Sequence, residues 1–223
     1  MKKIILFSLL IIGLTSSFII SKKIPLHTTQ ETSILRKIAN AHGFENWKNV
    51  REIKFTFNVD RDTVHYDRNW AWNPRTNDIT ATLEGKTIKY NWSTMDSTAR
   101  KTNAGFINDK YWLLTPFQLI WDEDNITHHH TFKAEAPISH KPMQKLTIVY
   151  GNEGGYTPGD AYDFYFEDDY IIQEWIFRKR NTPTPSLTTT FEDYKEFKGL
   201  KIATSHKRQG PNFNLYFTNI DVR

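Results

Sequence analysis

Cysteine is absent from all 223 residues of the sequence. Without thiols the chain forms no disulfides, although a domain of about 200 residues can build a sufficient hydrophobic core without them. The absence also removes the acceptor to which bacteria attach an N-terminal lipid. We therefore expect a chain that is stabilised by packing alone and carries no lipid anchor on a cysteine.

Runs of positive charge are also missing. The formal net charge is +4, and the lysines and arginines are scattered, with no run of five or more. Proteins that bind nucleic acids gather their basic residues into patches or runs. The distribution therefore argues against a nucleic-acid partner.

The common signatures of catalysis and metal binding are absent as well. The sequence has no H-E-x-x-H, no Asp-rich calcium loop and no G-x-S-x-G nucleophile elbow. The glycine-rich segment GNEGGYTPGD at 151–160 lacks the Lys-Ser/Thr of a phosphate loop, so we interpret it as a hairpin or bulge loop. These observations predict no catalytic residue, no metal site and no cofactor.

The first twenty residues have the organisation of an export signal. A pair of lysines forms a positive n-region, residues 4–14 are apolar, and small residues follow at 15–17. The apolar stretch then continues to residue 20, so an uncleaved N-terminal anchor is the alternative. We predict that 1–20 is a signal peptide or anchor, that the protein is periplasmic, and that any membrane contact is made through this segment.

Aromatic residues make up 14% of the chain, and bulky rings favour strands over helices. From residue 53 onward apolar and polar residues alternate with the period of two that a half-buried strand requires. Turn signals rich in glycine, proline and asparagine separate these segments. The pattern predicts eleven strands, at about 53–59, 64–72, 79–83, 88–92, 127–134, 145–151, 161–167, 170–180, 187–195, 200–207 and 214–222.

One amphipathic helix is predicted before the strands. Thr28 and Glu31 have the spacing of a capping box, apolar residues recur at helical spacing over 34–41, and Gly43 is placed to end the helix. A second region, 93–124, interrupts the strand pattern. Its centre, DKYWLLTPFQLIWD at 109–122, is too apolar for a surface loop, and its proline disfavours one long helix. We interpret this region as mixed helix and loop in which the proline lets the chain turn.

These elements predict a mainly β fold of the α+β kind. Strand twist accumulates along a long antiparallel sheet, so the sheet curls and acquires a concave face. We expect an open half-barrel in a single domain spanning 28–223. The N-terminal helix and an inserted helical and loop lid at about 93–124 then cover its apolar concave face.

Four segments carry a resemblance to a known superfamily: HGFENWKNVREIKFTFNV, RNWAWNPRTNDIT, DKYWLLTPFQLIWD and GGYTPGDAYDFYFEDD. Over roughly residues 30–223 the chain resembles the LolA-like periplasmic lipoprotein carriers and lipid-binding proteins. The segments are most similar to an uncharacterised exported family of Bacteroidota. The resemblance implies a half-barrel with a helical lid over an apolar cavity, and it implies no catalytic residue. The outer-membrane receptor branch is lipidated on a cysteine, which this chain lacks.

We therefore predict that the protein binds a hydrophobic ligand, either a lipid or the acyl chain of a lipoprotein, on its concave face. Burying a methylene group contributes about 0.8 kcal/mol, so an acyl chain needs no special polar chemistry to be held. Plain core packing is the competing explanation for each ring taken singly. The predicted ligand-binding residues are Trp70, Trp72, Tyr90, Trp92, Trp112, Phe117, Trp121, Phe164 and Trp175.

Two other classes of function stay open. One is an envelope hydrolase or lyase that uses cavity residues, for which the candidates are His65, His128, His130 and Asp163. The other is a non-catalytic interaction module with a filled core and an envelope protein as its partner. Candidates for a polar mouth of the cavity are Arg51, Arg68 and Arg75.

Two polar features have simpler explanations. His128 and His130 share a face of their strand, and with His140 they resemble part of a metal site, but the ligand set is incomplete for zinc. We interpret them as an exposed polar strand. Glu174 is predicted to be a cross-strand charge partner.

Overall fold

The computed structural model describes residues 32–153, 157–208 and 213–223, and one compact unit extends from Thr32 to Arg223. The predicted signal or anchor at 1–20 and the predicted capping pair, Thr28 and Glu31, lie outside the described residues. Within the described ranges no helix is long and apolar enough to cross a membrane.

The described chain is mainly β. Its helices are α1 (Ile34–Ala41) and α2 (Ser97–Trp121), with short 3-10 helices η1 (Phe44–Asn49), η2 (Trp92–Thr94), η3 (Glu123–Asn125) and η4 (Lys179–Asn181). Its strands are β1 (Ile53–Arg61), β2 (Val64–Asn73), β3 (Asp78–Leu83), β4 (Lys86–Asn91), β5 (Ile126–Glu135), β6 (Pro142–Tyr150), β7 (Ala161–Phe166), β8 (Ile172–Arg178), β9 (Leu187–Thr190), β10 (Lys195–Phe197), β11 (Leu200–Ile202), β12 (Ser205–Lys207) and β13 (Phe213–Val222).

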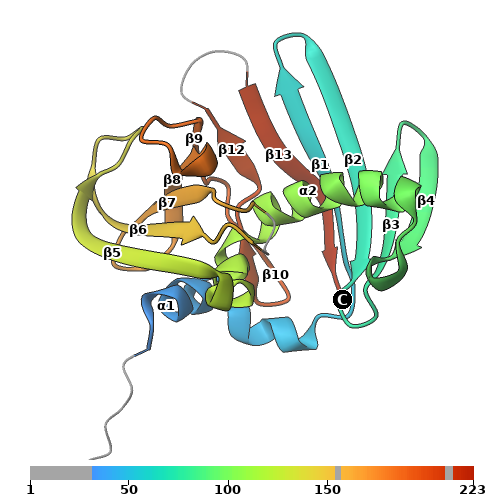
Figure 1. Ribbon diagram of the computed structural model, residues 1–223, viewed down its shortest axis with the longest axis horizontal. Coiled ribbons are helices and arrows are strands. Elements are labelled where there is room, and N and C mark those ends of the chain that lie inside the picture. Colours follow the sequence, from blue (N-terminus) through green and yellow to red (C-terminus); the bar gives the residue numbers. More distant parts are fainter. Residues whose placement is uncertain (1–31, 154–156, 209–212) are drawn as a thin grey trace, which may run out of the picture. The chain divides into compact units, whose positions relative to one another are not determined.

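The strands form two large antiparallel ladders. One has the order β12-β13-β1-β2-β3-β4 and the other the order β5-β6-β7-β8-β9, while β10 and β11 make a separate hairpin. Bridges between Thr189 and Arg208 and between Glu192 and Ser205 join the ladders where β9 meets β12. We call this junction the seam. Through it the ladders make one curled sheet, whose edge strands β5 and β4 do not pair with each other (Figure 1). The predicted open half-barrel is therefore confirmed.

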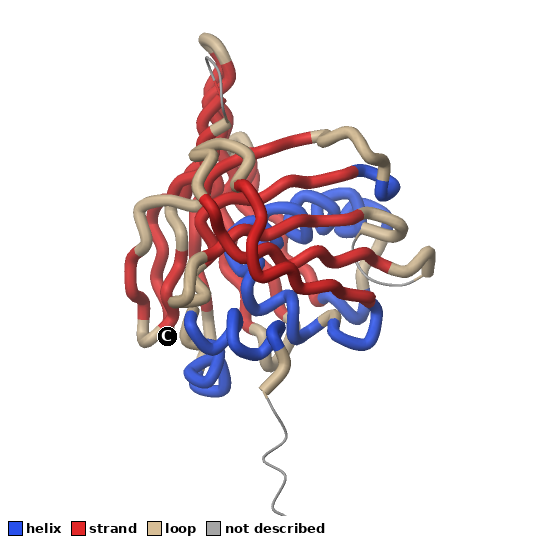
Figure 2. The backbone as a smooth tube through the Cα atoms, turned by 90° about the vertical axis from the view of Figure 1, so that its left-hand side faces the viewer, coloured by secondary structure: helices blue, strands red, loops and turns tan. Residues whose placement is uncertain are grey.

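The period-two alternation places the apolar side chains on the concave face. Ile53, Phe55 and Phe57 of β1 are buried, and two of them lie opposite Trp72 and Trp70 of β2. The β1–β2 hairpin projects beyond the rest of the unit, as Figure 1 and Figure 2 show from two directions. The strand prediction is confirmed for these elements. Predicted strands 187–195 and 200–207 are instead each divided, into β9 and β10 and into β11 and β12.

Helix α1 begins at Ile34. Its N-cap is Ser33, whose hydroxyl accepts the Arg36 N–H at 3.3 Å. The helix ends before Gly43, as predicted, and that glycine has a positive φ of 85°. A side chain at position 43 would collide with the carbonyl oxygen of Gly199. Only glycine therefore fits this turn without strain.

Helix α2 corrects the prediction of mixed helix and loop. It runs for 25 residues and continues through Pro116, with a bend at Leu114 where φ is −120° and ψ is 24°. A proline inside a helix lacks the N–H that bonds to the carbonyl four residues earlier, and its ring crowds that carbonyl. The bend makes room for the ring, and the Thr115 hydroxyl donates to the Tyr111 carbonyl at 2.5 Å. The proline bends the helix without turning the chain back.

Glu174 also differs from its prediction. Its carboxylate is buried and accepts the backbone N–H groups of Ile138 at 2.7 Å and Ser139 at 2.9 Å. It therefore fastens the turn between β5 and β6 onto the sheet, where Ala136, Met143 and Tyr165 form a small second core. Backbone donors take the place of the charged partner that the sequence indicated.

Candidate ligand cavity

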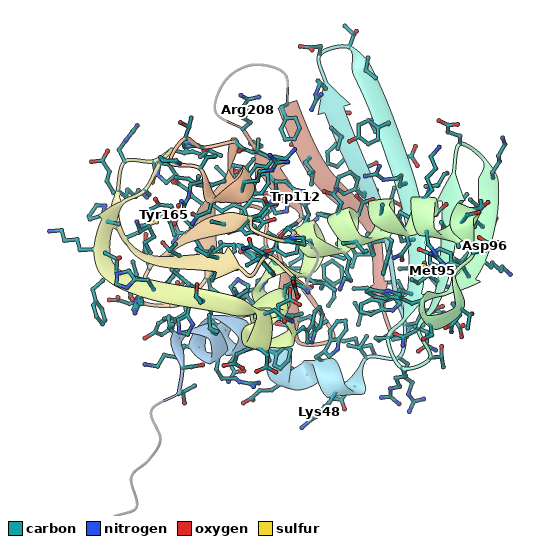
Figure 3. The ribbon with its side chains drawn as sticks, in the orientation of Figure 1. Lys48, Met95, Asp96, Trp112, Tyr165 and Arg208 are labelled. Carbon is teal, nitrogen blue, oxygen red and sulfur yellow. The ribbon has the colours of Figure 1, made fainter. Side chains whose placement is uncertain are left out.

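Helix α2 lies across the concave face and contacts both ladders. Its N-terminus is capped by Asp96, whose side chain accepts the Ala99 N–H at 2.7 Å, close to β4 (Figure 3). Phe106 packs against Trp70 and Trp72 of the β1–β4 ladder, with ring centroids 5.4 and 5.6 Å away. The ring of Trp112, farther along the helix, lies 4.4 Å from that of Trp175 in β8. One helix thus covers two differently built halves of the curled sheet.

A cavity of about 340 Å³ lies between α2 and the β5–β9 ladder. This volume falls in the range of about 300–1,000 Å³ typical of small-molecule sites. Most of the wall is apolar, and α2, β7, β8 and β9 supply nearly all of it. The described lining residues are Ala104, Ile107, Asn108, Tyr111, Trp112, Thr157, Tyr162, Trp175, Phe177 and Leu187.

The floor of the cavity is a set of packed rings. The ring of Tyr162 lies 5.2 Å from that of Trp175 and 5.1 Å from that of Phe177, measured between centroids. The ring planes of these two pairs are inclined by 33° and 31°. Tyr111 approaches Tyr162 from the helix at 5.1 Å. Such offset arrangements are favourable for aromatic side chains. The floor is therefore a closely packed aromatic surface.

A buried chain of polar groups lies behind the floor. The Tyr111 and Tyr150 hydroxyls are 3.3 Å apart, and Tyr150 donates to the Asp122 carboxylate at 2.8 Å. The Gln118 amide also donates to Asp122, at 2.8 Å. Burial raises the pKa of Tyr111 and of Tyr150 well above the ordinary value. Both phenols are therefore neutral hydrogen-bonding groups at physiological pH.

The mouth is less buried than the floor. Ile107, Phe177 and Leu187 are each half-buried there, and Asn108 is exposed. The Asn108 amide donates to the Asp109 carboxylate at 3.0 Å. Asp109 is fully buried and accepts further bonds from the Arg68 guanidinium and from the Trp70 indole at 2.8 Å. Burial raises the pKa of Asp109, and the bonds from Arg68 oppose that rise.

Only two of the nine predicted ligand-binding residues line the cavity, namely Trp112 and Trp175 (Figure 3 labels Trp112). Phe164 is fully buried below the floor, with its ring 6.0 Å from that of Trp175. The other six lie outside the cavity lining, in or against the main hydrophobic core. Those six are Trp70, Trp72, Tyr90, Trp92, Phe117 and Trp121.

Three of these six side chains surround a buried lysine. The Lys110 ammonium lies 5.4, 5.4 and 5.1 Å from the ring centroids of Trp72, Trp92 and Trp121, close enough for cation–π attraction. It also donates to Gln118 at 3.3 Å. Burial lowers the pKa of Lys110 to about 8, and nearby Asp122 partly opposes the change. This tryptophan cluster is a packed core around a cation.

The arginines predicted for a polar mouth have other roles. Arg68 forms an ion pair with Asp109, and Arg75 donates to the Lys48 carbonyl at 3.0 Å. Arg51 is exposed, and its backbone N–H donates to the carbonyl of the last residue at 2.6 Å. None of the three lines the cavity.

The candidates for catalysis also lie outside the cavity. His65 pairs with Asp60 at 2.6 Å near the tip of the β1–β2 hairpin. His128 is exposed on the edge strand β5, and His130 bonds to Gln144 at 2.9 Å. His140 pairs with Glu135 instead of joining these histidines. No group of three or more metal-ligating side chains occurs among the described residues.

Asp163 is the remaining catalytic candidate, and its neighbour in sequence shows which way it points. Asp163 bonds to Thr147 and to Arg178, while Tyr162 lines the cavity. Successive side chains of a strand point to opposite faces. Asp163 therefore lies on the face of the sheet away from the cavity.

Sequence reasoning missed several lining residues. Tyr111 precedes Trp112, and Tyr162 shares the alternating face of Phe164, so both signals were present in the pattern. Phe177 and Leu187 lie directly opposite each other on β8 and β9. The sequence carried no signal for that pairing, because it depends on the register of two strands joined by a long turn.

The fold and the cavity together define a class of protein: an open antiparallel half-barrel that encloses a partly open, largely apolar cavity beneath a long helix. No protein-family model matches the sequence, and no curated protein matches it significantly. Among solved structures the chain is similar to a DUF1329 family protein from Desulfovibrio piger. The likeness has 10% sequence identity and a TM-score of 0.46, and it covers 86% of this chain and 94% of that one.

Proposed function

We propose that the protein binds one apolar chain, from a lipid or from the acyl group of a lipoprotein, in the cavity between α2 and strands β7 to β9. The observation that carries this proposal is the cavity itself, with about 340 Å³ of space above a floor of aromatic rings. The half-buried apolar side chains at its mouth, Ile107, Phe177 and Leu187, give an apolar chain a path inward.

The volume sets the size of the ligand. At about 30 Å³ per small heavy-atom group, the share of one water in the liquid, the cavity of about 340 Å³ holds roughly eleven such groups. Burying about ten methylenes contributes on the order of 8 kcal/mol before the cost of ordering the ligand. A single chain of medium length fits this space, whereas a lipid with several long chains would leave most of its apolar surface outside.

The proposal includes the compartment. The lysine-led apolar segment at 1–20 supports export to the periplasm, with cleavage or with anchoring at the inner membrane. The segments that resemble the exported LolA-like family of Bacteroidota support the same location and a carrier role in the envelope. In that role the protein would hold a chain away from water and pass it to an envelope partner.

Binding of N-phenyl-1-naphthylamine, a neutral apolar dye that fluoresces when it leaves water, tests the proposal. We expect saturable binding by the native chain. In the variant Ala104→Trp an indole occupies the mouth, and we expect the affinity to fall by about tenfold or more, which equals about 1.4 kcal/mol. Ala104 is exposed, so the variant should fold.

The matched control is Thr98→Trp, which adds the same indole to an exposed position of the same helix away from the lining residues. We expect its affinity to be unchanged. Native mass spectrometry of the protein purified from its own host supplies a second measurement, and an added mass of one acyl chain or lipid is the expected result. No dye binding together with a clean apo mass would contradict the proposal and favour a non-catalytic interaction module.

A further inference from the structure

Two surface grooves share the short helix η1. Residues of α1 and η1, among them Arg36, Phe44, Trp47 and Lys48, line the first, which we call the aromatic groove. The second, the cationic groove, is formed by η1, the turn before β11, the start of β1 and the end of β13. We call the two grooves together the base. Figure 1 shows η1 and the end of β13 at the end of the unit opposite the tip of the β1–β2 hairpin.

Basic residues outnumber acidic ones at the base. Glu45 is the acid among the described lining residues, whereas the basic ones are Arg36, Lys48, Arg51, Lys198 and Arg223. Arg223 already pairs with two acids outside the lining, Asp221 at 2.8 Å and Glu52 at 3.8 Å. Arg51 and Lys198 are exposed, and neither forms an ion pair with a described acid. The base therefore presents unbalanced positive charge to solvent.

Hydrogen bonds hold the cationic groove together. The Asn46 amide donates to the Gly199 carbonyl at 3.0 Å, which fastens the turn that carries Lys198 to η1. The Arg51 N–H donates to the Arg223 carbonyl at 2.6 Å, which fixes the end of β13 beside the start of β1. Three segments that are distant in the sequence thus bring their cations to one groove. Guanidinium and ammonium groups in such a place are suited to phosphate oxygens.

The aromatic groove adds partly exposed rings beside these cations. Phe44 and Trp47 are half-buried. The Trp47 ring lies 4.9 Å from that of Trp121, and the Arg36 guanidinium lies 5.2 Å from the Phe44 centroid. Aromatic rings flanked by long basic side chains are typical of surfaces at a membrane–water boundary, where the rings lie at the level of the headgroups and the cations reach the phosphates.

We propose that the base docks the folded unit on an anionic lipid surface, with Arg51 and Lys198 at headgroup phosphates. Clusters of exposed lysine and arginine are attracted to anionic lipids over about a Debye length. This docking goes beyond the proposed function, because no residue that lines the ligand cavity belongs to the base. The described chain enters the unit through α1, which contributes Arg36 to the base. An anchor at 1–20 and the base would therefore meet the same membrane.

A single fluorophore on the base tests the proposal in the full chain. The sequence has no cysteine, so Asn49→Cys, at an exposed neutral position in the cationic groove, is the one site that a thiol-reactive dye labels. The matched label is on Thr63→Cys, in the exposed turn between β1 and β2. Vesicles with a headgroup-attached quencher contain phosphatidylcholine alone or with an equal part of phosphatidylglycerol. We expect phosphatidylglycerol to increase quenching at position 49 and to leave position 63 unaffected.

Charge reversal tests which residues make the contact. Arg51→Glu with Lys198→Glu, introduced into the chain labelled at position 49, should abolish the increase that phosphatidylglycerol causes. Raising the salt concentration from about 50 to about 500 mM should do the same, because salt screens exposed charges. The matched control is Lys86→Glu with Arg208→Glu, an equal change of charge at exposed positions outside the base, and it should keep the increase. Figure 3 shows Arg208 at the opposite end of the unit from Lys48.

Four results would overturn the inference. Equal quenching on both kinds of vesicle would mean that the apolar N-terminal segment alone holds the chain. An increase that survives the reversal at Arg51 and Lys198 would mean that other groups make the contact. Equal loss in the control would assign the effect to net charge. If phosphatidylglycerol has no effect but inorganic phosphate changes the fluorescence at position 49, the groove binds free phosphate and the membrane assignment is wrong. The cavity plays no part in these measurements, so failure of the dye-binding test would refute the proposed function alone.

Discussion

The ion pair between Arg68 and Asp109 yields the most quantitative prediction. Asp109 is fully buried, and the Arg68 side chain, which is 27% exposed, donates to both of its oxygens. Replacing Arg68 with methionine keeps most of the apolar stem and leaves the carboxylate with two neutral donors. Removing one partner of a buried pair costs about 3–5 kcal/mol. Since Arg68 is partly solvated, we expect about 3 kcal/mol of lost stability at neutral pH.

The pH dependence of this loss gives a sharper test. Burial already raises the pKa of Asp109, and removing the opposing arginine raises it further. A carboxyl whose folded-state pKa is raised contributes stability at low pH that is lost as the pH rises through that pKa. The difference between the variant and the native chain should therefore be largest at neutral pH and should shrink on acidification, while the protonated Asp109 still accepts the Trp70 bond.

Urea unfolding followed by tryptophan fluorescence at several pH values would measure both effects. Arg75→Met is the matched control, because that exposed arginine only donates to a backbone carbonyl, and its loss should cost at most about 0.5 kcal/mol. The double variant Arg68→Met with Asp109→Leu removes both charges and should recover part of the stability. A loss below about 1 kcal/mol in Arg68→Met, or a loss that is the same at all pH values, would refute the reasoning.

Three further predictions concern the scaffold. Glu174→Ala leaves two backbone N–H groups without their acceptor and should cost about 2–3 kcal/mol in urea unfolding, and a loss under about 0.5 kcal/mol would contradict the assigned contact. The added methyl group in Gly43→Ala would collide with a backbone carbonyl, whereas position 85 has a positive φ but open space around it. We therefore expect Gly43→Ala to lower the melting temperature more than Gly85→Ala does. Equal melting temperatures would contradict this. Burial lowers the pKa of His206 to about 3, so the native chain should lose about 2 kcal/mol of stability between pH 7 and pH 5 through this residue, and His206→Gln should show a correspondingly flatter pH profile.

The strands and the open architecture could be predicted from the sequence for a physical reason. In β1 the apolar residues Ile53, Phe55 and Phe57 alternate with polar ones, so the alternation alone marks the concave side. Residue alternation gives no guidance for the helical region around Pro116. The helix continues there because Leu114 leaves helical geometry and the Thr115 hydroxyl donates to the Tyr111 carbonyl. Neither adjustment can be recognised from the sequence.

The cavity was harder to predict than the fold because ring size alone does not distinguish a wall from a core. The sequence predicts Trp72, Trp92 and Trp121 as ligand contacts, whereas in the structure their rings lie around the Lys110 ammonium. Which face of α2 meets which ladder depends on where the helix crosses the sheet, and that is a tertiary property. Trp112 lines the cavity because its side of the helix faces the β5–β9 ladder.

The seam has a mechanical consequence. Within each ladder the neighbouring strands share continuous pairs, whereas β9 and β12 meet through two isolated bridges and a few hydrogen bonds that involve side chains. The Glu192 and Ser205 backbones are bonded there at 2.9 and 3.3 Å. A weakly paired junction such as the seam opens by local fluctuation at a lower free energy than a central strand does. Hydrogen–deuterium exchange should therefore be faster at the backbone amides along the seam than at those of β1 or β7. The seam is thus the place in the described sheet where the two ladders can separate locally while the strand pairing inside each ladder is kept.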